Sequence, residues 1–319
     1  MPSLPLFLLC LICALVAASH TVRSEPEVNA QQSEIEILVM KDVLQDLPEF
    51  LQGQSIEGID HFDRPAARRD LVDYILLRQA LTIGLTLNTP KPVPTIKITP
   101  WRGASYNRLI SNLKLGQYTV FSHTLWREDF NRPALSTENT IDPQNNLYMT
   151  SATLRYGEIE AGLYMNPDNP KFQQQSDKIN LANLRAVSSS QWLPDWQALT
   201  QLPLKHVYDE VKWNNMFRMV QGQHADFMLI PFSSEPKLSF TALGITLSPI
   251  QGVKVALAGS RGWAISRSHP TGKTTYQAIE NGLSELRLRG VIPRAYIEAG
   301  VINANVAHWQ NLNLPNVTE

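Results

Sequence analysis

One group of residues suited to binding chemistry lies in the loop after residue 121. Ser122 and Thr124 carry hydroxyl groups, and Arg127 carries a planar guanidinium with several N–H donors. A guanidinium can form two parallel hydrogen bonds to a carboxylate, so this residue type suits the capture of an organic anion. The plain alternative for Arg127 is an ion pair with Glu128 or Asp129 at the surface. We expect the binding role, because loops at the carboxyl ends of strands are frequent ligand sites.

A second group is the serine run Ser188, Ser189 and Ser190, which precedes a helical segment that starts near Pro194. Free N–H groups at a helix start, together with serine hydroxyls, can hold an anionic group. The same residues can instead form an ordinary cap or loop. We expect Ser189 and Ser190 to contact a ligand.

Three aromatic residues could form walls around such a ligand. Trp101, Tyr106 and Trp126 lie close in sequence to the first polar loop. Small-molecule sites are mostly apolar with few polar groups, so we expect ligand contacts from Trp101 and Tyr106. Packing in the protein core is the alternative for each aromatic residue.

Spacing argues against three other kinds of site. Residues 268–275 resemble a phosphate-binding loop, but Arg267 stands where that motif needs a glycine, five positions before Gly272. The 7 His and 2 Cys residues show no metal-ligand spacing, so we expect no metal and no cofactor. His123 lies beside Ser122, yet adjacent residues of an extended segment point to opposite faces. Nucleophilic catalysis is therefore not indicated.

Composition limits the class of protein. The chain has 319 residues, of which 43% are hydrophobic, including 7 Trp, and the formal net charge is −1. This is enough apolar material for one large domain or two lobes. The basic residues are scattered, so the sequence gives no sign of a nucleic-acid partner.

The first residues are typical of a secretory signal. Residues 4–18 are almost wholly apolar and are followed by small residues up to Ser19, a run too short to span a bilayer comfortably. No Lys or Arg precedes the apolar run, which departs from the usual pattern, and an uncleaved anchor is the alternative. We predict a signal peptide over residues 1–24 and an exported, periplasmic protein. Cleavage would remove Cys10 and Cys13 and leave no cysteine.

Apolar patterns predict an alternation of strands and helices. The first set ends with a strand before the polar loop, and a second set of the same kind follows after residue 160. Such alternation is typical of α/β sheets with parallel strands, and two sets indicate two lobes. We expect strands at 35–40, 95–99, 118–121, 184–187, 206–208, 227–230 and 262–266, and helices at 68–87, 105–115, 194–202, 213–221, 273–289 and 293–301.

Four segments carry a family resemblance: residues 105–127, 179–191, 208–226 and 279–296. In this order they resemble the type II periplasmic binding proteins, specifically the extracellular solute-binding protein family 3. The resemblance implies an α/β fold with a ligand cleft between two lobes, with two crossings of the chain. It implies that lobe 1 comprises residues 34–163 plus 262–319 and that lobe 2 comprises residues 164–261.

The resemblance also bears on the ligand. The residue of the family that matches Arg127 binds a ligand carboxylate. Amino-acid binders of the family place a carboxylate about five residues after the aspartate that matches Asp226, where this chain has Pro231 and then Phe232. The nearest acid is Glu235. We therefore expect a small polar, anionic ligand rather than a standard α-amino acid.

These observations predict a solute-binding protein rather than an enzyme. We expect a monomer that captures a small molecule for an ABC-type transporter or a membrane sensor. One alternative is a lyase or dehydratase on the same scaffold, with Glu235, Glu128 or Asp129 as its acid. The other is a regulatory ligand-sensing module for a membrane partner.

Overall fold

The first sheet combines three parallel strands with two antiparallel ones. The computed structural model describes residues 33–87, 93–101, 106–130, 146–173, 179–232 and 236–313. β1 runs parallel to β2 and β3, and β14 is antiparallel to β3 and β5. The order across the sheet is β2 (Thr95–Trp101), β1 (Glu34–Met40), β3 (Val120–Phe121), β14 (Ala264–Ser266) and β5 (Leu147–Met149).

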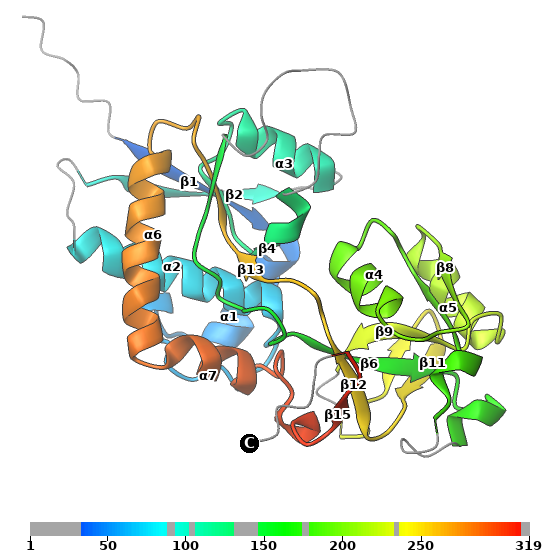
Figure 1. Cartoon of the computed structure of the whole chain (residues 1–319). Helices are drawn as coiled ribbons and strands as arrows, with labels where there is room; N and C mark the ends of the chain where they lie inside the picture. Colours follow the sequence, from blue (N-terminus) through cyan, green and yellow to red (C-terminus); the bar gives the residue numbers. More distant parts are fainter. Residues whose placement is uncertain are drawn as a thin grey trace, which may run out of the picture. The chain divides into compact units, whose positions relative to one another are not determined.

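Helices cover both faces of this sheet because β1 is apolar on both sides. Ile37 and Val39 face a core cluster shared with α2 and α6, and Leu38 faces a second cluster shared with α3. Such a continuous apolar run is expected for a strand buried on both faces. The helices are α1 (Lys41–Leu51), α2 (Arg69–Leu87), α3 (Tyr106–Lys114), α6 (Gly272–Leu288) and α7 (Val291–Glu298) (Figure 1).

Two glycines let α2 and α6 pack at very close range. A Cβ atom added to Gly84 would lie 1.8 Å from the Ala278 carbonyl oxygen, and one added to Gly282 would lie 1.9 Å from that of Ala80. Any side chain at either glycine would push the helices apart. α2 is buried over most of its length, which explains its nearly uniform apolar sequence.

The second sheet has a parallel part and an antiparallel part. β7 runs parallel to β8 and β9, whereas β6 is antiparallel to β9, β11 and β12. Helices α4 (Leu193–Thr200) and α5 (Trp213–Gln221) accompany the parallel strands (Figure 1). The strands are β6 (Glu160–Met165), β7 (Arg185–Ser188), β8 (His206–Asp209), β9 (Phe227–Pro231), β10 (Phe240–Ala242), β11 (Ile245–Pro249), β12 (Val253–Ala256) and β15 (Gln310–Asn311).

The chain connects the two sheets three times, where the resemblance implies two crossings. The first two lie between β5 and β6 and between β12 and β14, and the second contains β13 (Arg261–Gly262), which pairs with β4 (Leu125–Trp126). The third follows α7, because β15 pairs with β12. The largest cluster of buried apolar residues has members from both sheets. The division into lobes at 34–163 plus 262–319 and at 164–261 stays a prediction.

The α/β fold class predicted from the sequence is confirmed by these two sheets and their helices. Each strand and helix expected from the apolar pattern has a counterpart in the structure. The predicted signal peptide, residues 1–24, lies outside the described residues. Within the described ranges, no helix is both long and apolar enough to cross a membrane.

Candidate functional site

The backbone after β3 is fixed, and this holds Ser122 in place. The Ser122 N–H donates to the Leu38 carbonyl at 2.9 Å, and the Ser122 carbonyl accepts from the Trp263 indole N–H at 3.1 Å. The Ser122 hydroxyl is buried, and no group of the described chain forms a hydrogen bond with it. Buried hydroxyls usually have a partner, so an unpartnered one at a strand end is a candidate contact for a ligand.

His123 is a neutral side chain next to Ser122. Its ring packs edge-on against Phe121 with 3.9 Å between centroids, and its Nδ1 atom is buried without a partner in the described chain. Burial lowers the pKa of His123 to about 3, although the nearby Asp70 carboxylate opposes this shift. The imidazole is therefore uncharged near neutral pH and can accept or donate one hydrogen bond at each nitrogen.

Arg127 is half-buried at the start of the short 3-10 helix η2 (Arg127–Phe130). One guanidinium nitrogen donates to the Thr150 carbonyl, and the buried Nε has no hydrogen-bond partner in the described chain. Among the described residues, no carboxylate lies within ion-pair distance of Arg127. Its neighbour Glu128 instead accepts from the Ser260 N–H at 3.2 Å. The charge of Arg127 thus has no anionic partner among the described residues.

Thr124 belongs to a buried network beneath this loop. Its N–H and hydroxyl donate to one Asp73 oxygen at 2.9 and 2.8 Å, and its hydroxyl accepts from the Arg261 Nε at 3.0 Å. The other Asp73 oxygen accepts from the Tyr296 hydroxyl at 2.6 Å. Thr124 therefore joins α2, β13 and α7 below the loop, and its hydrogen-bonding capacity is used within the protein.

The network links Asp73 and Arg261 through the Thr124 hydroxyl rather than by a direct ion pair. Burial lowers the pKa of Arg261 to about 10, although Asp73 opposes the shift. Burial raises the pKa of Asp73, against the effect of Arg261. The Arg261 guanidinium also lies over the Trp126 ring, 4.7 Å from its centroid. Asp73 and Arg261 therefore hold the loop above them through Thr124.

The predicted serine run ends β7, at the carboxyl edge of the second sheet. The Ser190 N–H and hydroxyl donate to the two Asp209 oxygens at 2.9 and 2.7 Å, and these bonds lower the pKa of Asp209. The Ser189 hydroxyl accepts from the Gln191 N–H at 3.2 Å. Ser188 is buried, and its carbonyl accepts from the Glu210 N–H. A carboxylate of the protein thus already occupies the donors of Ser190.

Other side chains at this second edge are also partnered or apolar. Glu210 accepts from the Lys212 N–H at 2.9 Å and from the Asn215 amide at 3.2 Å. Trp192 and Val211 are exposed, at 37% and 58% of their surface. The edge therefore offers apolar surface rather than free charge.

Asp195 in the first turn of α4 differs from the other acids of this edge. Burial raises the pKa of Asp195 to about 6, against the effects of its own backbone N–H and of Arg261. A carboxyl group with this pKa exchanges its proton near neutral pH.

The remaining predicted site residues have varied positions. Trp101 ends β2, half-buried, and packs edge-on against Phe121 at 5.4 Å. Tyr106 begins α3, but its side chain is outside the described part of the chain, and Glu235 also lies outside it. Asp226 is buried and pairs with Lys171 and Arg185.

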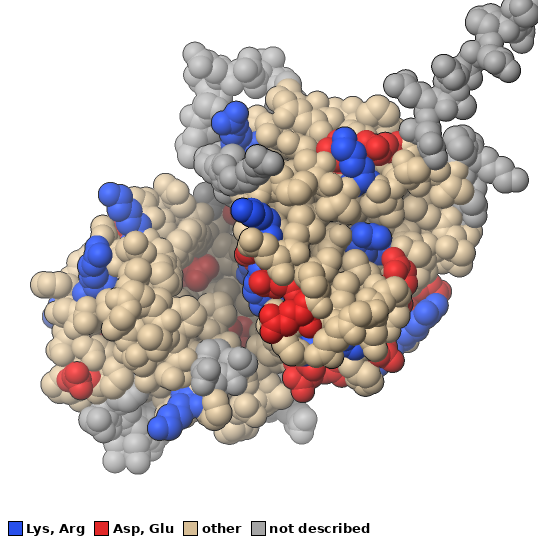
Figure 2. All heavy atoms as spheres, turned by 180° about the vertical axis from the view of Figure 1, so that it is seen from behind, with Lys and Arg blue, Asp and Glu red and all other residues tan. Residues whose placement is uncertain are grey.

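Charges elsewhere give no competing site. On the face shown in Figure 2, Lys and Arg side chains are scattered among Asp, Glu and uncharged residues, with no continuous basic surface among the residues drawn in colour. The described residues hold no cluster of three or more His, Cys, Asp or Glu side chains that could bind a metal ion.

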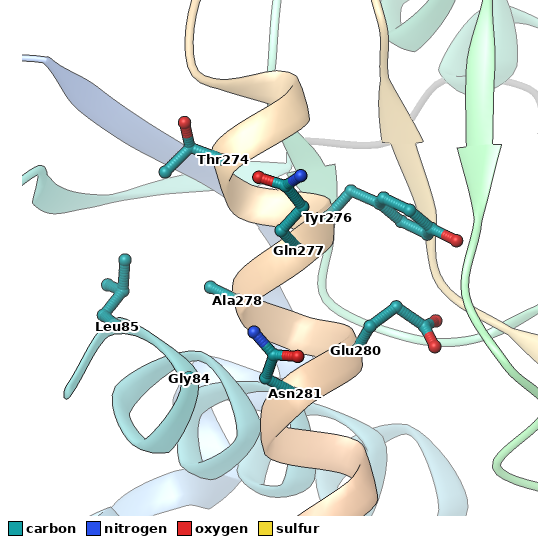
Figure 3. A pocket seen from close by; sticks show the side chains of 8 residues that line it. All are labelled: Gly84, Leu85, Thr274, Tyr276, Gln277, Ala278, Glu280 and Asn281. Carbon is teal, nitrogen blue, oxygen red and sulfur yellow. The ribbon is translucent and has the colours of Figure 1, made fainter. Parts of the chain in front are cut away.

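A hollow of about 610 Å³ lies between α2 and α6, away from both edges. It borders the close contact at Gly84 and Ala278, and none of the predicted site residues lines it (Figure 3). Tyr276 and Glu280 project from α6 on the side away from Leu85, where Tyr276 stacks on Tyr148 and Glu280 accepts from the Ser151 N–H. The hollow follows from the helix packing and carries no assigned chemistry.

Sequence reasoning missed three residues of this region: Asp73, Asp195 and Arg261. Asp73 had a signal, because a lone acid within an apolar helix must find a buried partner. No signal in the sequence marked Arg261 or Asp195, since the residues that they interact with are more than 60 positions away.

Comparisons with known proteins find relatives by structure. No family model and no curated protein matches the chain. The probable amino-acid ABC transporter extracellular-binding protein ytmK from Bacillus subtilis is 12% identical, with 83% of this chain and 97% of that chain covered and a TM-score of 0.46. The periplasmic VFT2 domain of BvgS from Bordetella pertussis is 14% identical, with coverages of 83% and 94% and a TM-score of 0.44.

A third match is the ancestral amino acid-binding protein AncCDT-1, described as a precursor of cyclohexadienyl dehydratase. It is 11% identical, with 83% of this chain and 94% of that chain covered and a TM-score of 0.42. At these scores the matches do not indicate which ligand this chain binds or whether it is an enzyme.

Proposed function

We propose that this protein is an exported solute-binding protein whose loop after β3 captures a small polar anion. The observation that carries the proposal is the set of three buried polar atoms on this loop without a partner in the described chain: Ser122 Oγ, His123 Nδ1 and Arg127 Nε. All three follow a strand of the first sheet within six residues. Polar groups that follow the carboxyl end of a strand are a usual position for a small-molecule site.

The charge of Arg127 favours an anionic ligand. Within the described chain no carboxylate lies within ion-pair distance of Arg127, and His123 is neutral, so the charge of Arg127 favours an anionic partner. A carboxylate would receive charge-assisted hydrogen bonds from its guanidinium. Ser122 and His123 would then bind further polar atoms of the ligand. The binding of such a solute would serve a membrane transporter or sensor.

The test is a thermal-shift screen of the full chain against carboxylates, small peptides and amino acids. A true ligand at a concentration 100 times its Kd should stabilise the protein by about 2.7 kcal/mol. Arg127→Ala should weaken binding of the best compound at least tenfold, because a charge-assisted hydrogen bond contributes about 1.5–3 kcal/mol.

Arg287→Ala is the matched control for this experiment. Arg287 also donates to a backbone carbonyl, that of Ala152, but it lies on α6. Its loss should leave ligand stabilisation unchanged. Equal effects of Arg127→Ala and Arg287→Ala, or a screen without any stabilising compound, would overturn the proposal.

One observation favours an enzyme as a second candidate function. Burial raises the pKa of Asp195 to about 6, which is suitable for a general acid that works near neutral pH. Turnover of a carboxylate ligand by the purified protein, lost in Asp195→Asn, would support a lyase or dehydratase. Binding without turnover would leave the solute-binding function.

A further inference from the structure

The segment after α7 leaves the first sheet and joins the second. Up to Ile302 the chain contacts α7, where the Val301 and Ile302 N–H groups donate to the Tyr296 carbonyl. Tyr296 itself is fixed to Asp73 of α2. Val306 and Trp309, a few residues later, are buried in a core cluster of the second sheet. The chain thus passes from one core to the other within four residues.

Residues 303–313, which we call the C-terminal strap, are held to the second sheet by several independent contacts. β15 pairs in parallel with β12, and the Gln310 and Leu312 N–H groups donate to the Gly252 and Lys254 carbonyls at 2.9 Å. The Asn313 side chain forms two hydrogen bonds with the Ala256 backbone, at 2.9 and 2.8 Å.

A buried lysine and an aromatic pair complete the attachment. The Lys254 ammonium, in β12, donates to the Val306 carbonyl at 2.8 Å and pairs with Glu160 at 2.8 Å. The Trp309 ring packs at right angles against Phe232, with 5.3 Å between centroids. Such contacts would be costly to break, because the buried Lys254 ammonium would lose a carbonyl acceptor and the Trp309 ring would lose its packing against Phe232.

The other two crossings lie against each other. The Leu257 N–H donates to the Ile159 carbonyl, and the Arg261 N–H donates to the Leu154 carbonyl, both at 2.8 Å. Two adjacent connections form a single hinge, about which two bodies can rotate. The strap adds a third connection to these two, and a third connection limits the rotation.

We propose that the C-terminal strap is a third tether that limits how far the two sheets of this protein can separate. Four residue-to-residue steps separate Ile302 from Val306, so these two positions stay within about 14 Å even when the chain between them is fully extended. The strap therefore sets the range of opening in the protein with or without ligand.

Distance measurement between two fluorescent labels tests the proposal without a ligand. The described residues contain no cysteine, so Cys10→Ser and Cys13→Ser give a chain without native cysteines. Labels at Lys273→Cys in α6 and Gln221→Cys in α5 then report on the separation of the two sheets, since both positions are exposed. Deletion of residues 303–319, or Trp309→Ala with Asn313→Ala, should lengthen the mean distance and broaden its distribution.

Val220→Ala is the matched control, because it opens a cavity in the same core cluster of the second sheet from α5 and leaves every strap residue unchanged. It should lower the melting temperature and leave the distance distribution unchanged. If the double variant does not fold, Asn313→Ala alone removes two hydrogen bonds and should still broaden the distribution. A lower melting temperature with an unchanged distribution in every strap variant would overturn the proposal and leave the strap a purely structural strand.

Discussion

The carboxyl edges of the two sheets differ in how their polar groups are satisfied. At the first edge, Ser122, His123 and Arg127 each keep a buried polar atom without a partner in the described chain. At the second edge, Asp209 receives both donors of Ser190, and Glu210 is bound by backbone and amide groups. Similar residue types at the two strand ends thus differ in whether their polar atoms have hydrogen-bond partners. A solute bound at the first edge would supply the partners that are missing there.

The difference has a physical origin beneath each edge. The first loop rests on the buried pair of Asp73 and Arg261, which fixes its backbone through Thr124. A preorganised loop can hold unsatisfied groups in position, because the strain is offset by the structure around it. At the second edge, by contrast, the polar groups form hydrogen bonds with one another.

Among the substitutions that test this difference between the edges, replacement of Asp73 should have the largest effect on stability. Asp73→Ala leaves Arg261 and the Tyr296 hydroxyl buried without their anion, which should destabilise the protein by about 3–5 kcal/mol. Urea unfolding measures this loss. Asp73→Asn keeps the shape and should cost less. A loss below 1 kcal/mol in Asp73→Ala would show that the first loop does not rest on this pair.

Replacement of Asp195 should stabilise the protein at neutral pH. The folded pKa of about 6 exceeds the ordinary value of 3.8, so the folded state binds more protons between these values and stability falls as pH rises through them. At pH 7 the raised pKa of Asp195 therefore lowers the free energy of unfolding by up to about 3 kcal/mol. Asp195→Asn should remove the cost.

Urea unfolding at two pH values tests this effect. The Asp195→Asn variant should be more stable than the native chain at pH 7, and the difference should shrink below pH 4. A variant that is equally stable at both pH values would contradict the raised pKa, and a variant that is less stable at pH 7 would show that the carboxylate is favourably bound.

A pair of serine variants should give the smallest and most specific effects. Ser190→Ala removes the hydrogen bond from the Ser190 hydroxyl to Asp209, keeps the one from the backbone N–H, and should cost about 1 kcal/mol of stability while ligand binding changes little. Ser122→Ala removes no hydroxyl hydrogen bond to a described residue and should change stability by less than about 0.5 kcal/mol. Ligand titrations should show weaker binding in Ser122→Ala alone. The reverse pattern would place the ligand at the second edge.

Much of the fold could be predicted from the sequence, because apolar periodicity fixes strands and helices where they face a core. The helix α1 escaped prediction since Pro48 lies inside it and interrupts the expected pattern. The hairpin of β10 and β11 turns at Leu243 and Gly244, both with positive φ, and Leu243 gives no turn signal.

The candidate site was less predictable than the fold. Loop residues such as Ser122 and Arg127 could be found from their type and their place after a strand. Whether their polar atoms have hydrogen-bond partners could not be predicted, because that depends on residues elsewhere in the chain. Asp209 accepts from the Ser190 hydroxyl, whereas no described residue bonds to the Ser122 hydroxyl. The strap was also hidden, since β15 has two residues and no apolar alternation.

The most direct test of the account is a crystal structure of the chain with the compound that stabilises it most in the thermal-shift screen. We predict an acidic oxygen of the compound within hydrogen-bond distance of Arg127 Nε, and a polar atom of the compound on Ser122 Oγ. Density for the compound elsewhere, with both atoms of the first edge still without a partner, would contradict the account.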